Sequence, residues 1–236
     1  MPRTAETAAH SQTLSRGLTA LEILADSRAP LTIAEVAESL GLHRSIAYRI
    51  IRTLEDHSLV ERDDSGRLLP GAGLAVLARG VARDLQSAAA PELGRIADEL
   101  GMTAFVVVWD HAECVTLSTA EPRHNGAAIA QRPGTRHSVA SGAPGIAIQS
   151  ALGRAEWEQR MPDIPYRPEA DEARSRGYAV SHDEVIPGVF AVAVPIQPAR
   201  QRPSALAVVH LGPNLDAAAI GATLQAAARR IADAVS

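Results

Sequence analysis

Lysine is absent from this 236-residue chain, cysteine occurs once, and aromatic residues make up only 3% of the sequence. All 23 basic residues are therefore arginine, a pattern that together with frequent alanine reflects the codon supply of a GC-rich genome rather than a function. The single cysteine, Cys114, excludes an intramolecular disulfide and a zinc site built from several cysteines. It also suits a reducing compartment.

Long apolar runs are missing as well. No stretch reaches the roughly 18 consecutive apolar residues of a membrane span, and the first residues, MPRTAETAAHSQ, lack the apolar centre of a signal peptide. We therefore expect a cytoplasmic protein with no membrane partner and a flexible N-terminus over residues 1–11. The net charge of −4 excludes a general polyanion binder, so any DNA affinity must come from locally placed arginines.

The segment from Leu31 to Leu69 carries the strongest pattern. It predicts two short amphipathic helices separated by a turn at Gly41, with Thr32 and Glu35 forming a capping box at the first. Two short strands, 59–62 and 67–69, follow with an Asp-Asp-Ser-Gly turn between them. An earlier helix with Leu14, Leu18, Leu21 and Leu24 would cover this pair. The order predicts a winged helix-turn-helix.

The second helix of the pair places arginines on the face opposite its apolar stripe. Arginine offers a planar fork of donors that fits guanine or phosphate, and a helix fits the major groove of DNA. A solvated polar face, or a winged helix that binds protein, is the alternative interpretation. The predicted DNA-contacting residues, the last two in the wing, are Thr32, Arg44, Ser45, Tyr48, Arg49, Arg52, Arg62 and Arg67.

After the wing, the Pro-Gly-Ala-Gly sequence of residues 70–73 interrupts regular secondary structure. A narrow apolar stripe of Leu74, Leu77, Val81 and Leu85 then predicts one helix. We interpret it as a linker helix that pairs two copies, with an ordinary buried helix as the alternative. At this length, with 46% hydrophobic residues, two packed domains are expected. The predicted division is a DNA-binding domain over 12–71, a linker helix over 72–87 and a second domain over 88–236.

The second domain alternates between helical and strand patterns. A helix from Pro91 precedes strands, helices and a final helix, which together predict an α+β fold around a largely antiparallel sheet. The predicted strands are Thr103–Trp109, Cys114–Ser118, Ala127–Gln131, Tyr178–Ser181, Val189–Ile196 and Ala205–Leu211. The predicted helices are Ala143–Ala151, Glu169–Arg176 and Asp216–Val235.

The chain resembles the IclR family of bacterial transcriptional regulators from about Leu14 to Val235. The resemblance is carried by LTIAEVAESLGLHRSIAYRIIRTLEDHSLVERD, VASGAPGIAI, RGYAVSHDEVIPGVFAVAVPI and ALAVVHLGP. It implies a winged helix-turn-helix followed by a GAF-like effector domain. It also implies a homo-dimer or homo-tetramer on a pseudo-palindromic double-stranded DNA operator, controlled by a small-molecule effector.

The chain departs from the family at its effector pocket. Ala140, Ser141 and Gly142 replace a His-Ala-Thr or His-Ala-Ser run, Ala191 replaces a frequent cysteine, and apolar residues replace two serines near the end of the last strand. We therefore expect an apolar, aromatic or acyl-like effector rather than a small hydrophilic acid, or else a pocket that no longer responds. The expected contacts are Trp109, Ala140, Ser141, Gly142, Ala143, His182, Asp183, Ala191, Val209 and Leu211.

Metal-binding and catalytic patterns are weak. His111-x-x-Cys114 and His182-Asp183-Glu184 bring ligand-type residues together, yet neither supplies a full set of zinc ligands. The sequence has no G-x-S-x-G elbow, phosphate-binding loop or dinucleotide fingerprint. We expect no enzyme, metal or cofactor. The alternatives left open are a constitutive DNA-binding regulator with a degenerate pocket and an enzyme acting on a small acid.

Overall fold

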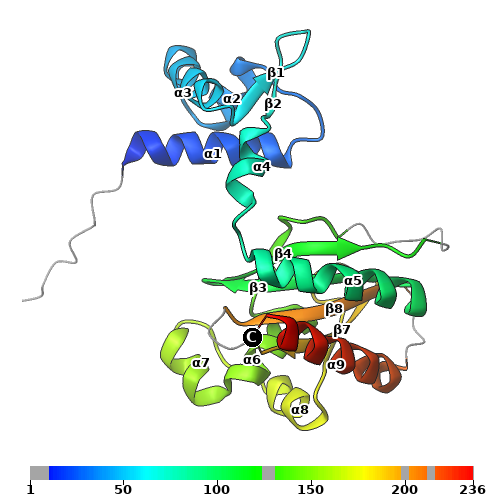
Figure 1. The fold of residues 1–236 in the computed structure, drawn as a ribbon. Helices are drawn as coiled ribbons and strands as arrows, with labels where there is room; N and C mark the ends of the chain where they lie inside the picture. The colour runs from blue at the N-terminus through cyan, green and yellow to red at the C-terminus, as the bar shows by residue number, and fades with distance from the viewer. Residues whose placement is uncertain (1–10, 124–130, 198–201, 212–215, 236) are drawn as a thin grey trace, which may run out of the picture. The chain divides into compact units, whose positions relative to one another are not determined.

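The computed structural model describes residues 11–123, 131–197, 202–211 and 216–235. The chain divides into two compact units, Met1–Val81 and Ala82–Ser236, and its fold is α+β (Figure 1). The flexible N-terminus expected over 1–11 and the strand expected over Ala127–Gln131 fall outside the described ranges except for their last residues. Gln131 itself lies in no strand.

The first unit is a winged helix-turn-helix, as the sequence predicts. It contains α1 (Gln12–Asp26), α2 (Ile33–Ser39), α3 (Arg44–Asp56) and the antiparallel pair β1 (Val60–Arg62) and β2 (Leu68–Pro70). The predicted capping box begins α2: the Glu35 amide donates to Thr32 Oγ1 at 3.2 Å, and the Thr32 amide donates to the Glu35 carboxylate at 2.6 Å. The core of this unit consists of Ala20, Leu24, Val36, Ile51, Val60 and Leu68.

The single linker helix expected over 72–87 is instead two helices, α4 (Gly73–Ala78) and α5 (Arg83–Leu100). Ala82 has a left-handed backbone (φ 43°) and separates them. The division follows the packing, because Leu85 is buried in the core of the second unit whereas Leu77 is exposed. Pro91 does not begin a helix as expected but lies inside α5, whose buried stripe continues on both sides of it.

The second unit is built on a six-stranded antiparallel sheet in the order β5-β4-β3-β8-β7-β6. Five strands lie where the sequence predicts them to within two residues, and the short β5 was not predicted. The bounds are β3 Thr103–Asp110, β4 Glu113–Ala120, β5 Arg136–Ser138, β6 Ala179–His182, β7 Val189–Ile196 and β8 Ser204–Leu211.

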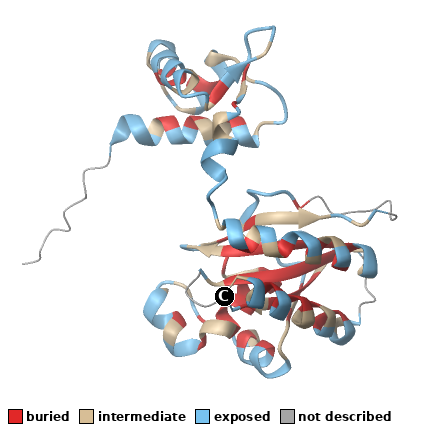
Figure 2. Ribbon diagram, viewed as in Figure 1, coloured by how far each residue is buried: buried red, intermediate tan, exposed pale blue. Residues whose placement is uncertain are grey.

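Helices cover both faces of this sheet, which is why its strands read as nearly continuous apolar runs (Figure 2). On one face lie α5 and α9 (Ala217–Ala234), packed on Val106, Val192 and Val208. On the other lie α6 (Gly142–Leu152), α7 (Arg154–Arg160) and α8 (Glu169–Arg176), packed around Phe105 and Cys114. The α7 segment, which was not predicted, buries only Trp157 and so has no apolar stripe.

No helix in the described ranges is both long enough and apolar enough to cross a membrane.

Candidate nucleic-acid interface and ligand cavity

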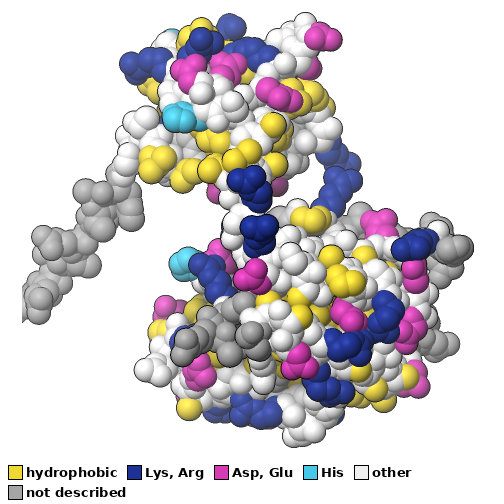
Figure 3. Space-filling view, viewed as in Figure 1, with side chains coloured by type: hydrophobic (Ala, Val, Ile, Leu, Met, Phe, Trp, Pro, Cys, Tyr) yellow, Lys and Arg dark blue, Asp and Glu magenta, His cyan; other side chains and the backbone are white. Residues whose placement is uncertain are grey.

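The outer face of α3 is polar and solvent-exposed, as the sequence predicts. Ala47, Ile50 and Ile51 are buried, whereas the opposite face exposes Arg44, Ser45, Tyr48, Arg49 and Arg52. In Figure 3, dark blue side chains gather at the α3 end of this unit. The helix begins after His43, whose Nδ1 lies 3.4 Å from the Ser45 amide that donates to it. This cap fixes the start of the basic helix.

Two arginines of this face are unpaired among the described residues. Arg44 and Arg49 take part in no ion pair there, while Arg52 Nε lies 3.6 Å from Asp56 Oδ1 in an exposed pair. Such surface pairs contribute little and exchange readily. Arg44 and Arg49 therefore have their guanidinium donors available for a phosphate or a base edge.

The wing arginines are committed to contacts inside the unit. Arg62 donates to Glu55 at 2.5 Å and to the Gly66 carbonyl at 3.1 Å, which ties the wing to α3. Arg67 donates to the Pro30 carbonyl at 3.0 Å and lies 3.4 Å from the Glu35 carboxylate. Thr32 is likewise engaged in its cap. In the structure, these three members of the expected DNA-contacting set make hydrogen bonds within the unit.

A small cavity lies between the N-terminus of α6 and the sheet. Its volume is about 40 Å³, far below the roughly 300 Å³ at which small-molecule pockets begin. Of the expected effector contacts, Gly142, Ala191 and Val209 line it, and Ala143 is the next residue along α6. The remaining lining residues are Phe105, Gln131, His137, Pro144, Ser181, Glu184, Val185, Ile186 and Val189.

The other expected contacts lie outside this lining. Trp109 stacks on Trp157 with ring centroids 5.7 Å apart, and His182 stacks on Phe190 at 3.7 Å. Leu211, at the end of β8, is 51% exposed. The last three lie in turns: Ala140 and Ser141 precede α6, and Asp183 adopts a left-handed backbone between β6 and β7.

The polar contacts of this cavity involve the first two amides of α6. The Gly142 amide donates to the Glu184 carboxylate at 2.8 Å, and the Ala143 amide donates to Ser181 Oγ at 2.8 Å. Arg167 donates to both oxygens of Glu184, at 3.1 Å in one of the two bonds. Burial raises the pKa of Glu184, but the bonds from Arg167 and Gly142 outweigh it and hold that pKa below its ordinary value. Glu184 is therefore ionised at neutral pH.

Sequence reasoning missed several of these residues for different reasons. Phe105 and Val189 share a sheet face with residues that were predicted, so strict alternation along β3 and β7 would have indicated them. The Glu184–Gly142 contact joins positions 42 residues apart, and no local pattern indicates such a contact.

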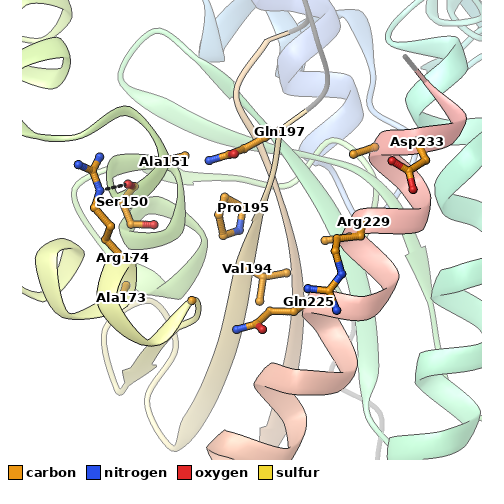
Figure 4. Close-up of a pocket in the computed structure, with 13 residues that line it drawn as sticks. Ser150, Ala151, Ala173, Arg174, Val194, Pro195, Gln197, Gln225, Arg229 and Asp233 are labelled. Atoms are coloured by element: carbon orange, nitrogen blue, oxygen red, sulfur yellow. Dashed lines mark hydrogen bonds between the residues drawn. The ribbon is translucent and has the colours of Figure 1, made fainter.

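A second, larger groove of about 420 Å³ lies between α8, α9 and the end of β7 (Figure 4). Val194 and Pro195 lie between the two helices in this view, and Arg174 donates to the Ser150 carbonyl at 2.8 Å. Arginine, glutamine and aspartate side chains share its lining with apolar ones. Small-molecule sites are mostly apolar with few polar groups, so this mixed groove fits one less well.

Within the described ranges, no three His, Cys, Asp or Glu side chains lie close enough to hold a metal ion. The His111 and Cys114 side chains occupy opposite environments, since His111 is 92% exposed and Cys114 is fully buried.

Comparisons with known proteins agree with this architecture. Residues 13–64 match the IclR helix-turn-helix domain. The chain is 29% identical over 214 residues to the glycerol operon regulatory protein of Streptomyces coelicolor, covering 81% of each protein. Its fold matches an IclR transcriptional regulator from Alicyclobacillus acidocaldarius with a TM-score of 0.81 and 25% identity, covering 97% of this chain and 100% of that one.

An IclR homologue from Microbacterium hydrocarbonoxydans, solved in complex with 4-hydroxybenzoate, also has this fold. It superimposes with a TM-score of 0.81 at 21% identity, over 95% of this chain and 99% of that one. The winged helix-turn-helix, the helix-covered sheet and these similarities together lead to one conclusion. The first unit carries an IclR-type helix-turn-helix domain, and most of the chain is similar in sequence and fold to transcriptional regulators of the IclR family.

Proposed function

We propose that this protein acts in the cytoplasm as a homo-dimer or homo-tetramer on a pseudo-palindromic operator. In this proposal α3 reads the major groove and a small molecule bound in the second unit changes operator affinity. The observation that carries the DNA part is the exposed face of α3, where Arg44 and Arg49 have no ion-pair partner among the described residues. The protein acts by binding rather than by catalysis, in keeping with relatives that are named as regulators.

The α3 residues have different roles in this proposal. Arg49, near the middle of the helix, is assigned to a base edge, and Arg44 at its start is assigned to a phosphate. Ser45 and Tyr48 assist at the edges, and Arg52 binds a phosphate after leaving its weak pair with Asp56. Thr32, Arg62 and Arg67 act indirectly. Thr32 caps α2, Arg67 ties the wing to the segment before α2, and Arg62 ties the wing to α3.

Pairing of two copies is argued from exposed apolar side chains. Val76, Leu77 and Val81 are 62%, 67% and 50% exposed in or just after α4. Leaving such side chains in water is unfavourable, and one winged domain makes too few base contacts for specificity in a genome. The proposed seam contains Leu77 and Val81 but not Leu85, because Leu85 is buried in the second unit.

The effector site is assigned to the cavity below α6. Its walls include Phe105, Val189, Ala191 and Val209, which favour an aromatic or acyl ligand. At about 40 Å³ the cavity must widen to admit one, and Val185 and Ile186, both partly exposed, lie where it can open. The same small volume favours a second candidate function, a regulator that binds its operator without responding to any effector.

The test begins with operator sequences selected from a random duplex pool by the full-length protein. Arg49→Ala should weaken binding to the selected operator by about 1–3 kcal/mol and relax specificity at one position. Arg229→Ala, which removes an exposed arginine from α9, serves as the matched charge control and should bind normally. Intact operator binding after alanine replaces both Arg49 and Arg52 would exclude α3 as the reading helix.

Effector control is tested on the same operator by fluorescence anisotropy with a panel of aromatic and acyl compounds. A change in operator affinity with at least one compound supports the responsive regulator. Unchanged affinity with every compound favours the constitutive one.

A further inference from the structure

The N-terminus of α6 is capped by side chains from far along the chain. Helices normally begin with a nearby Ser, Thr, Asp or Asn that accepts from the first amides. Ser141 stands at that position here, but its hydroxyl donates to the Ser138 carbonyl and caps no amide. Ser181 and Glu184 accept from the first two amides instead. The end of this eleven-residue helix, a favourable place for an anion, is therefore already occupied by a carboxylate.

Arg167 fixes that carboxylate in place. Its guanidinium binds both oxygens of Glu184, and one of its nitrogens also lies 3.3 Å from the Ala140 carbonyl. The Arg167 and Glu184 side chains are only 19% and 26% exposed. The bidentate bond raises the pKa of Arg167, so both partners are charged. Arg167 is thus neutralised by a group of the same chain.

This arrangement requires a glycine at position 142. Gly142 has φ +80°, a conformation that side-chain-bearing residues rarely adopt, and a Cβ placed on it would lie 2.9 Å from Val185. Glycine therefore lets the segment after Glu184 close directly over the start of α6. The carboxylate and the apolar residues that follow it form one wall of the cavity.

The rest of the cavity offers neutral polar groups. His137 Nε2 is shielded from solvent without a hydrogen-bond partner in the described structure, and burial lowers the pKa of its imidazole. The amide of Gln131 donates to Thr116 Oγ1 at 2.9 Å. A ligand here would meet an uncharged imidazole, an amide and the Glu184 carboxylate. Its own carboxylate would lie beside Glu184, and like charges brought together away from water repel strongly.

We propose that Glu184 determines the specificity of this pocket: its carboxylate takes the anion position at the start of α6, so the pocket selects uncharged aromatic or acyl molecules and rejects carboxylates. The proposal rests on the proposed effector site and names its ligand class. Removing the charge of Glu184 should free the two Arg167 nitrogens that now bind it, so that they can bind a ligand carboxylate.

The experiment compares benzamide with benzoate, which have nearly the same shape but differ in charge. Isothermal titration of the full-length protein without DNA should show wild type binding benzamide more tightly than benzoate by about tenfold or more. Glu184→Gln, which keeps an acceptor for the Gly142 amide, should raise benzoate affinity about tenfold and leave benzamide affinity nearly unchanged. Adding Arg167→Ala to that variant should abolish the gain.

The matched control is Glu169→Gln, which also removes a carboxylate from Arg167 but makes no contact with Gly142. It should leave the benzamide preference intact. Thermal melting without ligand verifies that each variant is folded, and Glu184→Ala repeats the test should the glutamine distort the loop. Equal benzoate affinity in wild type and both Glu184 variants, including no binding by any of them, would overturn the proposal.

The result of the Glu184 experiment can be distinguished from the result of the effector-control experiment. If benzoate binds Glu184→Gln but operator affinity stays constant, the specificity assignment stands and effector control fails. If operator affinity responds to a ligand while the Glu184 variants keep wild-type selectivity, effector control stands and the assignment of Glu184 fails.

Discussion

Arg230 on α9 binds both carboxylate oxygens of Glu92 on α5, with Nε at 2.7 Å and Nη2 at 2.8 Å. The two residues are 138 positions apart and join the two helices that cover one face of the sheet. The hydrogen bonds from Arg230, with further help from Arg95, lower the pKa of Glu92 from 4.5 to about 2. This bridge makes the stability of the second unit depend on pH in a defined window.

Because the pKa of Glu92 is lowered on folding, its contribution is fully present above about pH 4.5 and is lost as the pH falls toward 2. Glu92→Gln should melt a few degrees below wild type at pH 7, and the difference should shrink steadily below pH 4.5. Circular dichroism melts across this range measure it. Glu156→Gln, which removes a carboxylate paired within α7, is the control. A difference that stays constant with pH would contradict the prediction.

Gly145→Ala should destabilise the second unit by about 1–3 kcal/mol, because overpacked sites cost this much. A Cβ at position 145 would lie 2.2 Å from the Val139 carbonyl oxygen, a backbone atom that cannot move away easily. Urea unfolding followed by tryptophan fluorescence reads this unit alone, since Trp109 and Trp157 both belong to it. Gly94→Ala, in open space on α5, should instead leave stability equal or slightly increased.

Changing both Leu77 and Val81 to glutamate should give monomers, because each exposed side chain would place a charge in the proposed seam. Light scattering after size exclusion gives the oligomeric state, and operator binding should weaken in parallel. Leu211→Glu, at another exposed leucine, should keep the wild-type assembly. Survival of the wild-type assembly in the double variant would place the interface elsewhere.

Arginines of the wing and of α3 should respond differently to substitution. Arg62→Ala breaks the tie between the wing and Glu55, so it should lower the melting temperature of the first unit and leave the salt dependence of DNA binding nearly unchanged. Arg52→Ala should do the opposite and reduce the slope of log affinity against log salt by about one. An unchanged melting temperature with a reduced slope for Arg62→Ala would show that the wing arginine binds DNA directly.

Local patterns were sufficient for most of the fold. The capping box of Thr32 and Glu35, the stripe of α3 and the apolar runs of β7 and β8 depend on residues close in sequence, and all were predicted. The prediction of a single linker helix was wrong because its apolar stripe joined Leu77, which is exposed, to Leu85, which is buried in the core of the second unit. Periodicity cannot tell which core a side chain enters.

The candidate site was predicted less completely for a related reason. Ala191 and Val209 were identified because their positions match a family pattern, and they do line the cavity. The contacts made by the first amides of α6 were not predicted. Those amides are occupied by Glu184 and Ser181, and only the folded chain brings these residues to α6.

The buried Cys114 gives this protein a built-in reporter of native-state opening. It is the only thiol in the chain, lies on β4 opposite His137 of β5, and burial raises its pKa to about 12. A thiol reagent can reach it only when this part of the sheet opens, so labelling kinetics in native buffer measure the free energy of that opening. A ligand that fills the neighbouring cavity should slow the labelling, which allows compounds to be screened without DNA and without an engineered label.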